Sequence, residues 1–213
     1  MSRLLIERSE LATARLVDQC GMGRTPLHVV TDWPGYFPNG PRTVERLLAA
    51  GADPDATTGG AQPETPLHWA ASSDDLEVAE ALIVGGAAID VPGGSIGTPV
   101  ENAVGYRCWH VARLLCARGA RVDKLWVAAG LGLLPLVREH VEDTPPPDRS
   151  DIDHALWQAC HGGQLRVAAY LLEHGADIDT IPDHHNARPM EIAAAPDTRR
   201  GLLIEWLAKR ATT

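Results

Sequence analysis

The amino-acid sequence predicts an all-α fold, a solenoid of about six stacked helix-turn-helix units. Two patterns that alternate along the chain carry this prediction. The first is "RTPLHVV" at 24–30, which returns as "ETPLHWAA" at 64–71 and "GTPVENAV" at 97–104, with more altered copies near residues 123, 154 and 188. The second is an aliphatic segment that contains a glycine, such as "VERLLAAGADPD" at 44–55. The first pattern recurs every 25 to 40 residues, a spacing typical of stacked helical repeats.

The first helix of each unit is expected to begin at the threonine of the first pattern. Thr25, Thr65 and Thr98 can cap a helix N-terminus, and each precedes a proline, which loses no hydrogen bond at the first helical position. Thr98 and Glu101 also have the spacing of a capping box. Small residues on one side of these helices, such as Ala70, allow a neighbouring helix to approach closely.

The second helix of each unit is predicted from an aliphatic stripe. Val78, Val111 and Val167 are each followed by a leucine four residues later, which is a helical spacing. Glycine is expected to end these helices, because it adopts a left-handed terminal turn without strain. The four predicted end positions are Gly51, Gly86, Gly119 and Gly175. One helix pair cannot bury both of its faces, so neighbouring units must stack.

The two patterns resemble those of the ankyrin repeat family. "TPLHWAA" at 65–71, followed by "VAEALIVGGAAID" at 78–90, is similar to the family signature, whose period is about 33 residues. The resemblance implies antiparallel helix pairs joined by β-hairpin loops, and a structural role for His28 and His68 at the helix start. The ending "DTRRGLLIEWLAKR" at 197–210 is similar to that of a group of bacterial ankyrin repeat domain-containing proteins.

We interpret the chain, residues 1–213, as a single domain. Residues 1–22 are expected to form a helical N-terminal cap. The six units lie near 23–62, 63–95, 96–120, 121–149, 150–185 and 186–213. The first unit carries an insertion, "TDWPGYFPNGPR" at 31–42, between its helices. The fourth unit is shortened, because "GARVDKLW" at 119–126 leaves almost no room for a hairpin.

Composition restricts the kind of partner. The net charge of −9 argues against nucleic acid, which is bound by clustered lysines and arginines. The most apolar stretch, residues 123–140, is too short and too rich in glycine to span a membrane. The N-terminus lacks the apolar core of a signal peptide. We therefore expect a soluble cytoplasmic protein with neither nucleic-acid nor membrane partners.

No motif of the chain predicts catalysis. A phosphate loop and the GxSxG, HExxH and Rossmann fingerprints are all absent from the sequence, and "GGSIG" at 93–97 fits a turn. His184 and His185 are adjacent, but a zinc site needs about four ligands and no second pair accompanies them. The four scattered cysteines form no CxxC pair. We predict no catalytic residue, no metal site and no cofactor.

A row of side chains is expected to face the concave groove that the resemblance implies. The position after the motif histidine holds Trp69, and exposed aromatic residues are frequent at binding hot spots. The aromatic residues of the insertion either add a second patch or fold back on their own helices. The predicted partner-binding residues are Trp69, Ser72, Ser73, Asn102, Tyr106, Gln158, His161, Trp33 and Tyr36.

Trp126 and Trp157 replace the motif histidine in the fourth and fifth units, so we expect the two indoles to lie side by side. One interpretation is that they fill the space left by the missing hairpin. The other is an open slot for a cationic ligand, with Glu101 and Glu191 beside it along the row.

These patterns predict a non-catalytic protein-interaction module that binds a peptide or a protein surface in its concave groove. We expect a monomer, although a role within a larger assembly and self-association are both compatible with the sequence. The alternative is a small-molecule-binding protein or an atypical enzyme that uses the irregular region of units three to five. A closed pocket of at least about 300 Å³ around Trp126 and Trp157 would favour the alternative.

Overall fold

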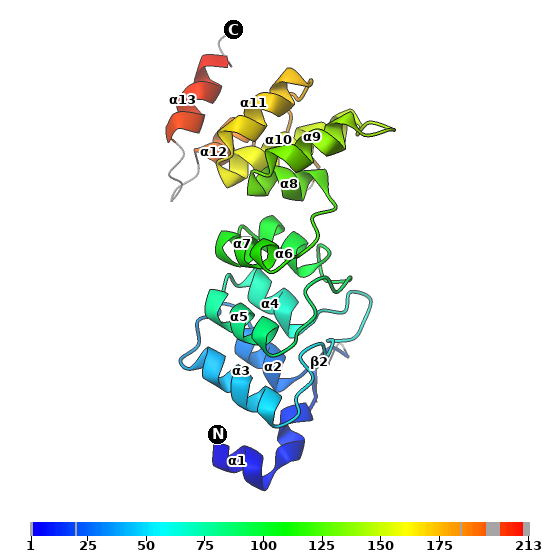
Figure 1. Ribbon diagram of the computed structural model, residues 1–213, viewed down its shortest axis with the longest axis vertical. Coiled ribbons are helices and arrows are strands. Elements are labelled where there is room, and N and C mark those ends of the chain that lie inside the picture. The colour runs from blue at the N-terminus through cyan, green and yellow to red at the C-terminus, as the bar shows by residue number, and fades with distance from the viewer. Residues whose placement is uncertain (1, 20, 184, 195–200, 211–213) are drawn as a thin grey trace. The chain divides into compact units, whose positions relative to one another are not determined.

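The computed structural model describes residues 2–19, 21–183, 185–194 and 201–210 (Figure 1). The chain divides into two compact modules, an N-terminal module, Met1–Arg121, and a C-terminal module, Val122–Thr213. In the described residues, helices follow one another in six successive pairs, and the strands form a single short ladder. This confirms the predicted all-α fold. None of the described helices is both long and apolar enough to cross a lipid bilayer.

The N-terminal segment is less helical than expected. It contains the helix α1 (Ser2–Glu7) and the 3-10 helix η1 (Ser9–Thr13), followed by the strand β1 (Leu16–Val17), which pairs antiparallel with β2 (Gly23–Arg24). A turn closes this ladder, because the Asp18 carboxylate accepts the backbone N–H of Met22 at 2.9 Å. The chain therefore enters the first repeat through a hairpin.

The N-terminal module continues with three helix pairs. They are α2 (Pro26–Thr31) with α3 (Gly40–Ala49), α4 (Pro66–Ser72) with α5 (Leu76–Val84), and α6 (Pro99–Gly105) with α7 (Trp109–Ala117). The predicted aliphatic stripe forms their core, since Val78, Leu82, Val111 and Leu115 are fully buried. The first helices also contact one another, α2 with α4 and α4 with α6, as expected for stacked repeats.

His28 and His68 each link the start of their own helix, α2 or α4, to the loop that leads into the next repeat. His28 Nδ1 accepts the backbone N–H of Thr25 at 3.2 Å, and its Nε2 donates to the Glu64 carbonyl at 2.9 Å. His68 repeats this geometry with Thr65 at 3.1 Å and with the Gly97 carbonyl at 3.1 Å. The structural role that the resemblance implied for these histidines is confirmed. The predicted capping box is also present, because Glu101 Oε2 accepts the N–H of Thr98 at 3.3 Å.

The insertion folds onto the following repeat. The backbone N–H of Tyr36 donates to the Asp75 carboxylate at 2.5 Å, and the Tyr36 hydroxyl donates to the Asp74 carbonyl at 2.6 Å. Both partners lie in the turn between α4 and α5. The insertion is therefore fastened at Tyr36, and the neighbouring Trp33 keeps 78% of its surface exposed.

The C-terminal module also consists of helix pairs. They are α8 (Leu125–Leu131) with α9 (Leu134–Glu142), α10 (Arg149–Gly162) with α11 (Leu165–Glu173), and α12 (Pro189–Ala193) with α13 (Gly201–Arg210). Leu156, Leu171, Leu203 and Leu207 belong to one buried cluster. The residues that link α7 to α8 contain no strand, which agrees with the shortened fourth unit.

Glycine ends the second helices where predicted. Gly51, Gly86, Gly119 and Gly175 have φ between 92° and 97°, in the left-handed region.

We expect Gly119→Ala to lower the free energy of unfolding by about 1–2 kcal/mol, because a side chain strains this conformation. Gly201→Ala is the matched control, since its φ lies outside that region and its Cβ position is open. Urea unfolding of both variants checks this, and equal stability would contradict the assignment of strain.

Candidate functional site

A pocket of about 450 Å³ in the N-terminal module collects five of the predicted partner-binding residues. It is lined by three aromatic rings, two carboxylates and three serine hydroxyls. We call it the aromatic–acidic pocket. Its lining residues are Asp32, Trp33, Glu64, Trp69, Ser72, Ser73, Ser95 and Tyr106.

The lining residues come from corresponding places in successive repeats. Asp32, Ser73 and Tyr106 are the C-terminal caps of α2, α4 and α6. Glu64 and Ser95 belong to the loops that lead into α4 and α6, and Trp33 opens the insertion. The pocket therefore lies where the ends of stacked helices meet the loops of the next repeat.

Trp69 is fixed by contacts with the first repeat. Its ring meets the His28 ring edge to face, with the ring centres 5.2 Å apart. The Arg24 guanidinium carbon lies 5.3 Å from the centre of the Trp69 ring, a cation–π distance. Trp69 is therefore half-buried and held in place, and it contributes part of its indole to the pocket wall.

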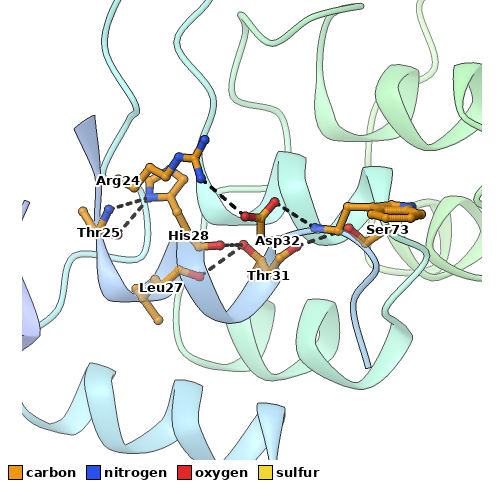
Figure 2. Close-up of polar contacts among 8 residues, drawn as sticks. Arg24, Thr25, Leu27, His28, Thr31, Asp32 and Ser73 are labelled. Atoms are coloured by element: carbon orange, nitrogen blue, oxygen red, sulfur yellow. Dashed lines mark hydrogen bonds and ion pairs between the residues drawn. The ribbon is translucent and has the colours of Figure 1, made fainter. Parts of the chain in front are cut away.

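Arg24 also pairs with the carboxylate that borders the pocket. Figure 2 shows Asp32 next to Arg24, whose Nη1 lies 3.5 Å from Asp32 Oδ2. Asp32 Oδ1 accepts the backbone N–H of Trp33 at 2.9 Å. Both partners of the ion pair are about two-fifths exposed, so we expect it to contribute at most about 1 kcal/mol to stability. Its main effect is to orient Asp32 at the start of the insertion.

Glu64 is held by one of its two carboxylate oxygens. Oε1 accepts the backbone N–H of Ser95 at 2.9 Å and the side-chain amide of Asn102 at 3.1 Å. Oε2 makes no hydrogen bond with any residue that the structure describes. Glu64 thus presents an oriented acceptor in the wall of the pocket.

Asn102 lies beneath the pocket and does not face solvent. Its side chain is fully buried, and its Oδ1 accepts the backbone N–H groups of Ile96 at 3.2 Å and Gly97 at 3.3 Å. Its Nδ2 donates to Glu64 and, at 3.3 Å, to Ser72 Oγ. Asn102, predicted as a contact residue, is placed by the structure as a positioning residue for the pocket wall.

The exposed rings and hydroxyls complete the pocket. Tyr106 is 48% exposed, and its hydroxyl lies 3.1 Å from Ser95 Oγ. Ser72 donates to the His68 carbonyl at 3.0 Å, and Ser73 donates to the Thr31 carbonyl at 3.2 Å, a bond drawn in Figure 2. Because these two hydroxyl protons are used within the fold, a ligand meets serine oxygens as acceptors.

Tyr36 lies outside the pocket lining, although it was predicted as a contact residue. Its phenol ring is 62% exposed, while its hydroxyl is bonded to the α4–α5 turn. Partial burial, together with the negative charges of Asp74 and Asp75, raises the pKa of the Tyr36 hydroxyl. Tyr36 therefore stays protonated at neutral pH and acts as a hydrogen-bond donor that anchors the insertion.

Gln158 and His161, the remaining predicted contact residues, lie in α10 of the C-terminal module. Each has only 2% of its surface exposed. The Gln158 amide oxygen lies 3.4 Å from His161 Nδ1, and its nitrogen lies 3.4 Å from His154 Nε2. The two side chains are part of the interior of that module.

The predicted tryptophan pair of the C-terminal module is separated by histidines. His154 stacks on Trp126 with ring centres 5.5 Å apart, and His185 stacks on Trp157 at 3.7 Å. The two imidazoles are 5.2 Å apart. Trp157 is only 5% exposed, and its Nε1 donates to the Ala187 carbonyl at 2.9 Å. These contacts favour the packing interpretation.

The two glutamates expected beside the slot cap their own helices. Glu101 belongs to α6 in the N-terminal module, where its Oε2 accepts from Thr98. Glu191 belongs to α12 in the C-terminal module, where its Oε2 accepts the backbone N–H of Arg188 at 2.7 Å.

A pocket of about 300 Å³ does border Trp126. Its other lining residues are Asp123, Lys124, Leu125, His140, Asp143, Pro145, Pro147, Asp151 and His154.

In the described part of the chain, no three or more His, Cys, Asp and Glu side chains form a group that could hold a metal ion. His184, which the sequence pairs with His185, lies outside the described residues.

In comparisons with known proteins, both modules match models of the same repeat family. Residues 36–124 match a family model of three consecutive ankyrin repeats, and residues 152–184 match a model of a single ankyrin repeat. A stretch of 62 residues is 42% identical to a putative ankyrin repeat protein of Rickettsia felis. That match covers 29% of this chain and 27% of the relative, so the chain spans about a quarter of the relative's length. The crystal structure of the human ASB11 ankyrin repeat domain aligns with a TM-score of 0.49 at 21% identity, covering 87% of this chain and 83% of that one.

Proposed function

Because the chain belongs to the ankyrin repeat family, whose members generally act in protein–protein interaction, we propose that it is a non-catalytic module that binds a peptide or a protein surface. The proposed contact region is the aromatic–acidic pocket and the concave side of the repeats around it. The observation that carries this proposal is the convergence of Trp33, Trp69 and Tyr106, from three different segments, on one pocket.

The exposure of these rings supports a binding role. Trp33 and Tyr106 are 78% and 48% exposed. Interface hot spots are rich in tryptophan and tyrosine, because these side chains bury a large area and lose little conformational entropy. The half-buried Trp69, held by its contacts with His28 and Arg24, supplies a third aromatic ring to the same pocket.

The polar groups near the pocket support the interpretation that the pocket binds a partner and does not catalyse a reaction. The Asp32 and Glu64 carboxylates each accept hydrogen bonds from the protein's own backbone. The Cys108 thiol of the same module is buried, which raises its pKa to about 12 and keeps it protonated at neutral pH. A protonated, buried thiol is a poor nucleophile.

The proposal predicts that Trp33→Ala combined with Tyr106→Ala lowers partner recovery by about tenfold or more, because two hot-spot side chains are removed. The measurement is affinity purification from lysate of the source cells, with quantitative mass spectrometry against the unmodified chain. Leu202→Ala is the matched control, since it also removes an exposed apolar side chain, from the C-terminal module. Equal recovery of the same proteins by all three chains would contradict the site.

A second candidate function is small-molecule binding next to Trp126. The observation in its favour is the pocket of about 300 Å³ that Trp126, His140 and His154 line. Trp157 and His161, which that hypothesis also needs, are buried. We therefore rank it below protein binding.

We also propose that the protein is a cytoplasmic monomer without a nucleic-acid partner. The net charge of −9, which repels phosphate backbones, supports the part of this proposal that concerns nucleic acid.

A further inference from the structure

The aromatic–acidic pocket has an excess of groups that attract a cation. Among its described lining residues, Asp32 and Glu64 carry the charges, and the lining also includes three aromatic rings. An apolar ligand would remove the Glu64 carboxylate from water without replacing its hydration, which is unfavourable. A positively charged group would satisfy the carboxylate and also be attracted by the aromatic faces.

The protein itself already holds one guanidinium, that of Arg24, near an aromatic ring and a carboxylate. Arg24, which is not a lining residue, places its guanidinium 5.3 Å from the Trp69 ring centre and 3.5 Å from the Asp32 carboxylate (Figure 2). An aromatic face and a carboxylate therefore already hold one guanidinium at the border of the pocket. Trp33, Tyr106 and Glu64 line the same pocket and offer the same two kinds of group, aromatic rings and a carboxylate.

Glu64 is oriented before any ligand arrives. Its Oε1 is held by the backbone of Ser95 and by the fully buried Asn102, while Oε2 has no partner among the described residues. The hydroxyl oxygens of Ser72, Ser73 and Ser95 supply further acceptors in the wall. A guanidinium carries five N–H donors in a plane and stacks on aromatic rings, whereas an ammonium is a compact and strongly hydrated charge.

We propose that this pocket binds the guanidinium of an arginine in the partner peptide. The guanidinium stacks against the exposed rings of Trp33 and Tyr106 and donates to Glu64 Oε2 and to serine hydroxyl oxygens. This inference rests on the proposed function and names the chemistry of its partner.

The test uses the full chain and the peptide acetyl-Gly-Gly-Arg-Gly-Gly-amide, titrated up to about 10 mM, since a single side chain is expected to bind in the millimolar range. Binding is followed through the indole N–H signals of Trp33 and Trp69 in ¹⁵N–¹H NMR spectra, assigned with Trp→Phe variants. We expect saturable shifts with arginine and none with citrulline, the uncharged analogue. The lysine peptide is expected to bind about fivefold more weakly.

Glu64→Gln is the variant that tests the carboxylate. The glutamine oxygen can still accept from Ser95 and Asn102, so the loop is retained while the charge is lost. We expect about a tenfold loss of affinity for the arginine peptide. Trp33→Ala, at a position that is 78% exposed, provides a second variant that leaves the fold intact and should weaken binding about threefold or more.

Each outcome supports or overturns the proposal. Equal shifts from the arginine and citrulline peptides, equal affinity for arginine and lysine, or full affinity in Glu64→Gln would each overturn it. If the arginine peptide fails to bind while the Trp33→Ala and Tyr106→Ala double variant still loses its partner, then only the arginine assignment fails. If the arginine peptide binds but the double variant retains every partner, then the proposed function fails.

Discussion

Replacing Asn102 with alanine is expected to lower the free energy of unfolding by about 3 kcal/mol and to remove arginine-peptide binding. The side chain is fully buried and makes four hydrogen bonds, two of which are to the backbone N–H groups of Ile96 and Gly97. Its loss leaves two part-buried backbone N–H donors without this acceptor, at about 1–3 kcal/mol each. It also frees Glu64 from one of the two groups that orient it.

Urea unfolding, followed by circular dichroism, measures the change in stability. Ser72→Ala is the control, because it removes the Ser72 partner of Asn102 and leaves the bonds of Asn102 to Glu64 and to the 96–97 backbone in place. We expect Ser72→Ala to lose no more than about 1 kcal/mol. If the two variants are equally stable, Asn102 does not position the pocket in the way its hydrogen bonds indicate.

Stability is also expected to fall when the pH is lowered below about 6.5, the ordinary histidine pKa. Burial lowers the pKa of His28, and its hydrogen bond to the Glu64 carbonyl offsets part of this effect. Burial likewise lowers the pKa of His68, with the Glu64 charge as the main opposing influence. In both residues Nδ1 accepts a backbone N–H, so protonation at Nδ1 would break the helix cap.

The direction of the pH effect follows from proton binding. Below about 6.5 the unfolded chain protonates these histidines while the folded chain does not, so acid favours unfolding. Each histidine contributes a slope of up to about 1.4 kcal/mol per pH unit, from about pH 6.5 down to its lowered folded pKa. Urea midpoints measured between about pH 7 and 5 test this, above the range where most carboxylates titrate.

A variant with His28→Gln and His68→Gln separates the histidine effect from other titrations. Glutamine can occupy the same position of a capping box but does not titrate. We expect the stability of this variant to depend less on pH between about 7 and 5 than that of the unmodified chain. An unchanged pH dependence would assign the acid sensitivity to other groups.

The helices could be predicted from sequence because their signals are local. The threonine and proline at 25–26 and 65–66 start helices whose caps the structure contains. Gly51 and Gly119 end helices through the left-handed conformation that glycine favours. The N-terminal segment was harder to predict, because its strand β1 depends on pairing with β2 and not on a local helix signal.

Part of the pocket was predictable, and part was not. The motif register placed Trp69 and Tyr106 among the residues expected to face the groove, and both line the pocket. Glu64 and Ser95 were missed, because both lie in loops where an acidic or hydroxyl residue carries no distinctive signal. One faint signal for Glu64 was its place directly before the threonine cap. The bond from the Ser95 N–H to Glu64 joins residues 31 positions apart, and only stacking brings them together.

The sequence by itself determined the repeat and the starts and ends of helices such as α2, α4 and α7, whereas the histidine caps were implied by the resemblance to the family. The helix starts and ends depend on residues within a few positions of one another, so they can be predicted from spacing and side-chain chemistry. Only the tertiary structure decided which members of the predicted row are accessible. Asn102 is fully buried beneath the pocket wall and Gln158 is buried inside α10, whereas Trp33 and Tyr106 stay exposed. Exposure depends on what the neighbouring repeat and the insertion cover, and that is a property of packing between distant segments.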